Sequence, residues 1–221
     1  LGIAEEAFVT VEDGQSISLG DKTLHFIYTP WVHWPETMVT WLEEDRVLFS
    51  CDFFGSHIAS SQLYVTDTCR VYEAAKRYFA EIMMPFRDKI KKNIEKLADY
   101  DIDMIAPSHG QIYTDPSFIM EAYKDWVYGT PRNKVVLPYV SMHASTQKMV
   151  YRLVESLEKN GVEVEQFDLS VTDIGKLAMS LVDAGTIVVG TPTILAGPHP
   201  YAAYCAFLAN ALKPKAGFLS I

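Results

Sequence analysis

Residues 29–57 read TPWVHWPETMVTWLEEDRVLFSCDFFGSH, and this stretch decides the fold of the first part of the chain. Two apolar runs, Met38–Leu42 and Arg46–Ser50, flank a charged turn at residues 43–45. Apolar runs joined by a short polar turn are typical of a β-hairpin. We therefore expect an antiparallel pair of strands whose outer ends lie side by side.

Side chains with metal-binding chemistry stand at those outer ends. His33 comes just before the first run and Asp52 just after the second, so the hairpin would bring them to one space. A second histidine, His109 in the sequence APSHG, also follows a short apolar run. Neutral imidazole nitrogen and carboxylate oxygen suit a transition-metal site, and one aspartate can bridge two ions. The alternative is that these are ordinary loop, turn or cap residues.

Short strands are expected before the hairpin, and mostly helices after it. The expected strands are Phe8–Val11, Ile17–Leu19 and Leu24–Tyr28. After an irregular segment at 53–68 we expect a helix over Val71–Tyr100 that Pro85 interrupts, a strand at 101–106, and a helix over Ser117–Tyr128. The Gly-, Pro- and polar-rich run Gly129–Asn133 is the best candidate for a domain boundary.

The pattern changes after residue 133 to alternating strands and helices. Apolar strands alternating with amphipathic helices predict βαβ units and a parallel sheet covered on both faces. The expected strands are Val135–Val140, Val162–Leu169, Thr186–Gly190 and Gly217–Ile221, and the expected helices are Thr146–Asn160, Asp173–Asp183 and Pro200–Leu212. Ligands of such sheets bind beyond the carboxyl ends of the strands.

Two loops follow these carboxyl ends. Ser141–Thr146 carries small hydroxyl residues before a helix N-terminus, which can hold a phosphomonoester. Ordinary helix capping by Ser145 or Thr146 is the alternative. Residues 191–200, TPTILAGPHP, contain three prolines and a glycine, which predicts a rigid irregular loop that can lie against a flat ring. The sequence has no Walker or Gly-x-Gly-x-x-Gly motif, which disfavours a nucleoside triphosphate or a dinucleotide.

Composition limits the class of protein further. The 221 residues are 49% hydrophobic with a net charge of −9, which permits a sizeable core and disfavours nucleic acid or an anionic membrane as partner. No apolar run is long enough for a membrane span. The three cysteines lie far apart and form no Cys-x-x-Cys pair, which fits a reducing compartment such as the cytoplasm.

The motifs TPWVHWPETM, LFSCDFFGSH and APSHG, in this order and spacing, resemble the second half of the metallo-β-lactamase-like domain of flavodiiron proteins, the A-type flavoproteins. The loops at 141–146 and 192–197 resemble the flavodoxin-like domain of the same family. The resemblance implies an α/β chain in two parts. Residues 1–130 would be the C-terminal part of an αββα metallo-β-lactamase-like domain, and residues 134–221 an incomplete flavodoxin-like doubly wound parallel sheet.

The resemblance also implies roles for individual residues. His33 matches a ligand of one iron, His109 a ligand of the other, and Asp52 the carboxylate that bridges both. The residues matching FMN contacts are Ser141, Met142, His143, Ala144, Ser145, Thr146, Pro192, Thr193, Ile194, Leu195, Ala196 and Gly197. The family commonly has an aromatic residue where this chain has His143, and glycine at or beside Ala144. His57 is either a hydrogen-bonding neighbour of the metal ligands or a plain loop histidine.

The implied activity is reduction of dioxygen to water, or of nitric oxide to nitrous oxide, with electrons passing through FMN to two irons. The implied donor is a rubredoxin or a reduced deazaflavin coenzyme, and the implied assembly is a head-to-tail homodimer or a tetramer. Two alternatives stay open: a zinc-dependent hydrolase of the same fold fused to a flavodoxin-like domain, and a non-catalytic gas sensor or electron carrier. The family's first ligand cluster, of the His-x-Glu-x-Asp type, is not in these 221 residues. The chain alone is therefore expected to bind iron weakly or not at all.

Overall fold

The computed structural model of the chain describes residues 2–220, and for residues 218–220 it describes the backbone alone. The chain divides into two compact units. Unit 1 comprises the residues up to Ala75 together with Asp88–Tyr123, and unit 2 comprises Lys76–Arg87 together with the residues from Lys124 onward. Among the described residues, no helix is both long enough and apolar enough to cross a lipid bilayer.

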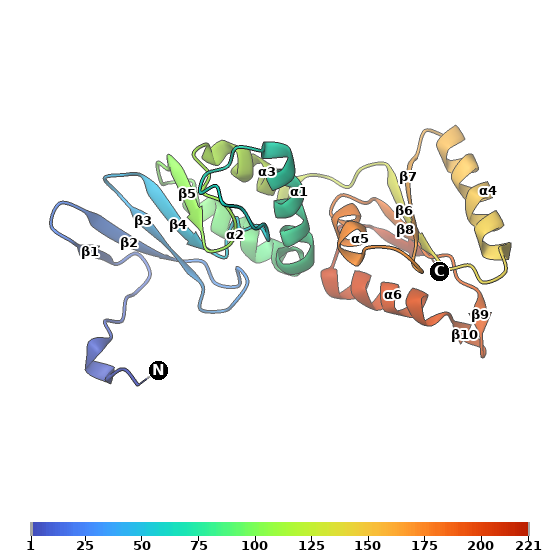
Figure 1. Cartoon of the computed structure of the whole chain (residues 1–221), viewed down its shortest axis with the longest axis horizontal. Coiled ribbons are helices and arrows are strands. Elements are labelled where there is room, and N and C mark those ends of the chain that lie inside the picture. The colour runs from blue at the N-terminus through green and yellow to red at the C-terminus, as the bar shows by residue number, and fades with distance from the viewer. Residues whose placement is uncertain (1, 221) are drawn as a thin grey trace. The chain divides into compact units, whose positions relative to one another are not determined.

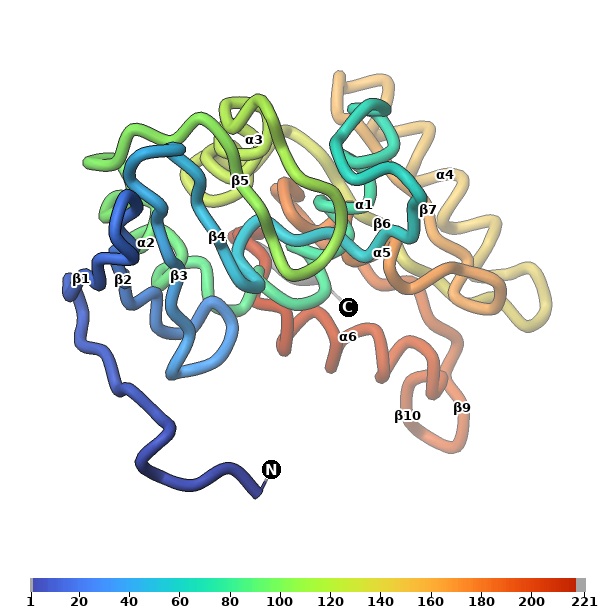
Figure 2. Tube along the Cα trace, turned by 60° about the vertical axis from the view of Figure 1, so that its left-hand side comes forward, coloured from blue at the N-terminus to red at the C-terminus, as the bar shows by residue number. Residues whose placement is uncertain are grey.

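Unit 1 contains a mixed five-stranded sheet whose strands follow one another in chain order (Figure 2). Neighbouring strands are antiparallel except the last two, which are parallel. The expected hairpin is confirmed, since Thr40 pairs with Phe49 and Leu42 with Val47. The five strands are β1 (Ser16–Ser18), β2 (Thr23–Tyr28), β3 (Met38–Leu42), β4 (Val47–Cys51) and β5 (Met104–Pro107).

One face of this sheet builds the core of unit 1. Four residues on neighbouring strands, each no more than 1% exposed, point to this face: Ile27, Val39, Leu48 and Ile105. Figure 1 shows α2 (Arg87–Leu97) and α3 (Pro116–Tyr128) gathered on one side of the sheet. Their buried residues include Ile90, Ile94, Ile119 and Tyr123. Removal of these apolar side chains from water is the main force that holds the helices on the sheet.

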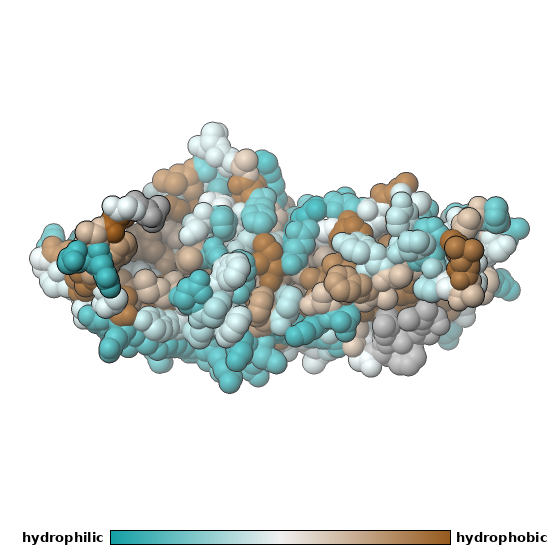
Figure 3. All heavy atoms as spheres, turned by 90° about the horizontal axis from the view of Figure 1, so that it is seen from below, coloured by the Kyte–Doolittle hydropathy of each residue, from teal (hydrophilic) through white to brown (hydrophobic). Residues whose placement is uncertain are grey.

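The opposite face of the same sheet is also apolar. Because side chains alternate along a strand, the strand-to-strand register places one set of residues on this face, of which only Thr40 is polar: Leu24, Phe26, Tyr28, Met38, Thr40, Leu42, Val47, Phe49, Met104 and Ala106. Tyr28 is 39% exposed, Met38 36% and Phe49 47%. Brown and tan apolar residues are visible in Figure 3 beside the N-terminal segment, at the left. We call this set the open face of the unit 1 sheet.

One expected strand is absent, and the expected interruption of the long helix is longer than the sequence indicates. Phe8–Val11 is not a strand. Phe8 and Val9 are 57% and 77% exposed, so their apolar side chains are not buried in a sheet as a strand's would be. The expected interruption of the long helix includes Pro85 but starts earlier, because the α-helix already ends at Tyr78. Proline 85 has no N–H to donate to a carbonyl of the preceding turn, so regular α-helical hydrogen bonding cannot continue through it. The segments are α1 (Thr68–Tyr78), a π-helical turn at Phe79–Met83, a 3-10 turn at Met84–Phe86, and then α2.

Unit 2 is built on four parallel strands in the order β11-β8-β6-β7. These are β6 (Lys134–Tyr139), β7 (Glu163–Asp168), β8 (Thr186–Val188) and β11 (Phe218–Ser220). The last expected strand, Gly217–Ile221, is present where it is described, and Ile221 lies outside the described residues. Figure 1 shows α4 (Ser145–Lys159) on one side of the sheet, and α5 (Ile174–Leu181) and α6 (Pro200–Leu212) on the other. The expected parallel sheet covered on both faces is therefore confirmed.

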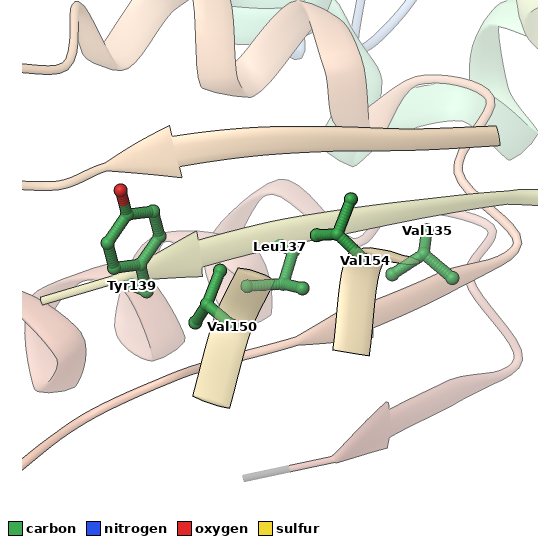
Figure 4. Close-up of a cluster of buried hydrophobic side chains, with 5 residues drawn as sticks. All are labelled: Val135, Leu137, Tyr139, Val150 and Val154. Carbon is green, nitrogen blue, oxygen red and sulfur yellow. The ribbon is translucent and has the colours of Figure 1, made fainter. Parts of the chain in front are cut away.

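The interior of unit 2 on the α4 side is a small aliphatic cluster (Figure 4). Val135, Leu137 and Tyr139 of β6 meet Val150 and Val154 of α4. All six residues of β6 are buried, as expected for the central strand of a parallel sheet with both faces covered. This cluster fixes α4 against the strand that leads into the Ser141–Thr146 loop.

Candidate metal centre and cofactor loops

Three turns of unit 1 meet at one edge of its sheet. His33 lies in the turn between β2 and β3, Asp52 directly follows β4, and His109 follows β5. Because β4 and β5 are parallel, their carboxyl ends open at the same edge, and the β2–β3 turn opens there too. The peptide bond before His33 is cis. The sheet thus brings together three residues that are far apart in the sequence.

The two imidazoles approach different oxygens of one carboxylate. His33 Nε2 lies 3.4 Å from Asp52 Oδ2, and His109 Nε2 lies 3.3 Å from Asp52 Oδ1. The Asp52 side chain is 18% exposed, so it is largely withdrawn from solvent, whereas His109 is about half exposed. The structure therefore gathers all three sequence-predicted residues, and their role as metal ligands stays a prediction.

Backbone hydrogen bonds join the Asp52 and His109 turns. Ser108 N–H donates to the Cys51 carbonyl at 2.7 Å, and Ser56 N–H donates to the His109 carbonyl at 3.0 Å. Gly110 has φ +94°, and a Cβ at this position would stand 2.2 Å from Ser56 Oγ. The sequence gives no direct signal that singles out Ser56 for a role at this site. The one hint in the sequence is that Ser56 lies only four residues after Asp52.

His57 lies beside the same cluster. Its ring centroid is 5.6 Å from that of His109, with the rings edge to face. Tyr113, buried behind the turn, donates its hydroxyl proton to the Phe54 carbonyl at 3.0 Å, and burial raises the pKa of this phenol well above its usual value. His57 is thus in ring contact with a candidate ligand, which favours a supporting role over that of a plain loop residue.

The three side chains offer two imidazole nitrogens and one carboxylate as possible ligands of a pair of transition-metal ions. Imidazole nitrogen and carboxylate oxygen suit iron or zinc, and the single carboxylate offers one oxygen toward each histidine. Within residues 2–220 no group of three or more His, Cys, Asp or Glu is placed to hold one ion. The chemistry of these three residues fits two ions, each of which would have one imidazole and the shared carboxylate.

The first cofactor loop, Ser141–Thr146, connects β6 to α4. The N-cap of α4 is Ala144, in a left-handed conformation and without a side-chain cap, so capping by Ser145 or Thr146 does not occur. Ser141 Oγ instead accepts from Gln147 N–H at 3.2 Å, while residues 142–145 are exposed. The pKa of nearby Tyr139 is raised, chiefly by burial. The first N–H groups of α4 have no intrahelical acceptors, as at any helix start, which fits an anion.

The second cofactor loop is a hairpin rather than the expected irregular loop. Its strands are β9 (Thr193–Ile194) and β10 (Gly197–Pro198), and Leu195 and Ala196 form the turn with φ of 48° and 63°. Positive φ at both central residues is the geometry of a type I′ turn, which sequence reasoning assigns to Asn and Gly and not to Leu and Ala. Leu195 is 100% exposed at the tip.

The two loops start from neighbouring strands. Tyr139 at the end of β6 bridges to Gly190, and Val140 N–H donates to the Gly190 carbonyl at 2.8 Å. A cavity of about 450 Å³ is bordered by Thr146 of the first loop and Thr191 of the second, and is otherwise mostly apolar. The other lining residues belong to β6, to α4 and to the end of β8, and residues 192–197 are not among them. The roles of these loop residues in binding FMN stay a prediction.

Comparison with known proteins places the chain in a class and then in a family. A model described as ODP family beta lactamase matches residues 1–110. The chain is 39% identical over 192 residues to the nitric oxide reductase of Moorella thermoacetica, which is 85% of this chain and 48% of that protein. It superposes on the rubredoxin oxygen:oxidoreductase of Desulfovibrio gigas with a TM-score of 0.90 and 32% identity, over 95% of this chain and 54% of the other.

A similar match is found with the flavodiiron protein of Giardia intestinalis, with a TM-score of 0.88 and 28% identity over 94% of this chain and 52% of that one. The chain is therefore an α/β protein whose mixed sheet matches the metallo-β-lactamase-like domain of flavodiiron proteins, followed by a smaller parallel sheet. It belongs to the flavodiiron protein family. The chain spans about half the length of the relatives it matches.

Proposed function

We propose that this chain is part of a flavodiiron oxidoreductase that reduces dioxygen to water, nitric oxide to nitrous oxide, or both. The observation that carries the proposal is the approach of His33 and His109 to different oxygens of Asp52, at 3.4 and 3.3 Å. A carboxylate shared in this way suits two ions held close together. The names of the similar Moorella and Desulfovibrio proteins, a nitric oxide reductase and a rubredoxin oxygen:oxidoreductase, support the two candidate substrates.

In this proposal each residue of the trio has one task. Asp52 would hold both ions through its carboxylate, and His33 and His109 would each bind one of them. The iron pair and FMN supply electrons one or two at a time when bound. The low exposure of Asp52 keeps water from competing for the carboxylate. His57, in ring contact with His109, limits the rotation of that imidazole.

The Ser141–Thr146 loop would hold the FMN phosphate through backbone N–H groups at the start of α4. Pro192–Gly197 would lie against the isoalloxazine ring. In the proposed division, residues 1–130 are the metallo-β-lactamase-like part and residues 134–221 the flavodoxin-like part. Rubredoxin or a reduced deazaflavin coenzyme would donate electrons. A head-to-tail dimer would bring the flavin of one subunit near the metal centre of another.

The open face of the unit 1 sheet supports the αββα assignment. A sheet that is apolar on both faces is stable when both are covered, and two sheets pack about 10 Å apart face to face. We infer that a second sheet, outside residues 1–221, covers Phe49, Met38 and their neighbours, and that it brings the remaining metal ligands to the same edge.

The experiment uses a polypeptide of the relatives' full length that includes this sequence. Iron, zinc and flavin are counted in the purified protein, and the consumption of each gas is followed with reduced rubredoxin. The proposal expects two irons and one flavin per chain, with consumption of at least one gas. Asp52→Asn should reduce iron binding and consumption, whereas the neighbouring exposed change Ser61→Ala should not.

A zinc hydrolase is the second candidate, because the model that matches residues 1–110 is described as a beta lactamase. Zinc in place of iron, with ester or thioester hydrolysis and no gas consumption, would favour it. Stoichiometric iron and flavin with gas binding but no turnover would instead favour the sensor or carrier.

A further inference from the structure

Ser56 touches the candidate metal centre through the backbone of His109. It is fully buried, and its N–H donates to the His109 carbonyl at 3.0 Å. Its hydroxyl occupies the space where a side chain of Gly110 would begin, 2.2 Å from the position of that Cβ. Ser56 therefore contacts both residues of the His109–Gly110 peptide, and it also lies four residues after Asp52.

The hydroxyl of Ser56 has no hydrogen-bond partner among the described residues. The phenol of Tyr113 is close enough that Ser56 partly offsets the rise in the Tyr113 pKa that burial causes. That phenol donates its proton to the Phe54 carbonyl at 3.0 Å, and Ser56 Oγ itself meets no donor or acceptor in good hydrogen-bond geometry. A buried hydroxyl without a partner lowers the stability of the fold, and an alanine of nearly the same size would avoid this cost.

We propose that Ser56 is a positioning residue of the candidate metal centre, whose N–H and hydroxyl together set the orientation of His109, and whose hydroxyl gains its hydrogen bond only when the centre is loaded. This inference rests on the proposed function. It explains why a polar atom stands unpaired at this position. Groups that hold a metal ligand from behind commonly change metal affinity by about tenfold or more when they are removed.

A purely structural serine and a positioning serine predict opposite results in the metal-free protein. Removal of a hydroxyl that holds the fold together lowers the melting temperature. Removal of an unpaired hydroxyl leaves the melting temperature unchanged or raises it. The effect of a positioning hydroxyl appears instead at His109 and in metal affinity.

The test compares Ser56→Ala and Ser56→Thr with Ser61→Ala, an exposed serine of the same segment. Three quantities are measured on the 221-residue chain: the melting temperature with chelator present, the ¹⁵N signals of the His109 imidazole by NMR, and the affinity for zinc ion by competition with a chromophoric chelator. We expect Ser56→Ala to melt at or above the temperature of the parent, to shift the His109 signals, and to lower zinc affinity about tenfold. Ser56→Thr keeps the hydroxyl and should lie closer to the parent in both of the last two measurements.

A lower melting temperature of Ser56→Ala with unchanged His109 signals would overturn the proposal. If the parent chain binds no measurable zinc, the melting temperature and the His109 signals still decide for or against Ser56. Failure of the proposed function is separate, because it is measured as missing iron, flavin or gas consumption in the longer polypeptide. Ser61→Ala must match the parent in all three measurements for the comparison to count.

Discussion

Gly110 shows how one residue without a side chain sets the path of the chain next to a candidate ligand. Its φ of +94° lies in the region that side chains disfavour, and its Cα faces Ser56. We predict that Gly110→Ala costs more stability than the strain of the backbone alone, because the new methyl group meets Ser56 Oγ at 2.2 Å and the Ser56 carbonyl at 2.9 Å. The added cost over backbone strain should be about 1–2 kcal/mol.

The matched control for this prediction is Gly161→Ala. Gly161 has φ +75°, and nothing lies within 4 Å of its missing Cβ. The Gly161→Ala variant should therefore lose only the stability that the left-handed backbone costs a residue with a side chain, about 1–2 kcal/mol. Urea unfolding of both variants measures the difference. Equal losses would mean that Ser56 and the His109 turn move aside at no cost, and that the turn does not fix the direction of His109.

Asp183 is a carboxylate in unit 2 that forms ion pairs with three positively charged side chains. It pairs with Lys134, whose side chain is only 3% exposed, and with Arg132 at 3.3 Å and Lys76 at 3.8 Å. Burial alone would raise the pKa of Asp183, but the hydrogen bond from Lys134 and the three positive charges together hold it below its ordinary value of 3.8. Asp183→Asn would leave Lys134 buried with a weaker partner, so we predict a loss of about 3 kcal/mol at neutral pH.

The pH dependence follows from the sign of this shift. A carboxyl group whose pKa is lowered by folding stabilises the protein fully above the pKa of the unfolded chain, near 3.8, and this contribution disappears as pH falls through the lower folded value. The parent should therefore lose more stability than Asp183→Asn between pH 5 and about pH 3. Urea unfolding at several pH values checks this. Parallel curves for the two proteins would show that folding does not lower the pKa of Asp183.

At the scale of elements, the unit 1 sheet separates a covered face from an open one. Leu48 and Phe49 are neighbours on β4 that point to opposite faces, with exposures of 0% and 47%. In the 221-residue chain we predict that Leu48→Ala costs about 2–5 kcal/mol, as for a buried leucine, and that Phe49→Ala costs less than half as much. Chemical denaturation gives both values. A similar cost for both would mean that the open face is covered in solution by a second copy of the chain.

Some elements could be predicted from the sequence because their patterns are strong. The β3–β4 hairpin has two apolar runs around a charged turn, and the alternation after residue 133 gives the parallel sheet and its helices. The β9–β10 hairpin could not be predicted, because its turn uses Leu195 and Ala196 where the rule expects glycine or asparagine. The π-helical turn at Phe79–Met83 leaves no mark in the periodicity of the sequence.

At the scale of the whole molecule, the compact units do not follow the chain in one pass. Residues 76–87 belong to unit 2, where Arg77 makes two hydrogen bonds with Asp173 at 2.8 and 2.9 Å and Arg87 donates to the Lys213 carbonyl at 3.2 Å. The boundary proposed at residues 129–133 divides the sequence into two segments. Unit 2 additionally includes residues 76–87, which come before that boundary in the chain. Local sequence signals cannot reveal a segment that returns to a distant part of the chain.

This arrangement predicts that residues 134–221 do not form a stable protein alone. Without residues 76–87, Asp173 loses its ion pair with Arg77 and Asp183 loses its ion pair with Lys76. Helix α5 also loses the turn Phe79–Met83 that packs against it. Circular dichroism of the isolated fragment should show no cooperative melting transition above room temperature. A cooperative transition like that of the 221-residue chain would mean that the segment is dispensable.

The candidate site could be predicted only as a set of residues. His33, Asp52 and His109 stand out because imidazole and carboxylate groups follow apolar runs, and their motifs resemble those of a known family. The contact of each histidine with its own oxygen of Asp52 depends on the order of β2 to β5 in the sheet, which no local pattern encodes. Ser56 is recognised only through its hydrogen bond to the His109 carbonyl.

The most direct test of the central claim is a crystal structure of a polypeptide of the relatives' full length, with anomalous maps collected on both sides of the iron absorption edge. We predict two iron peaks, one bonded to His33 Nε2 and the other to His109 Nε2, with one oxygen of Asp52 on each. A single peak, or peaks of another metal that leave Asp52 bonded to neither ion, would contradict the shared carboxylate and the flavodiiron function proposed from it.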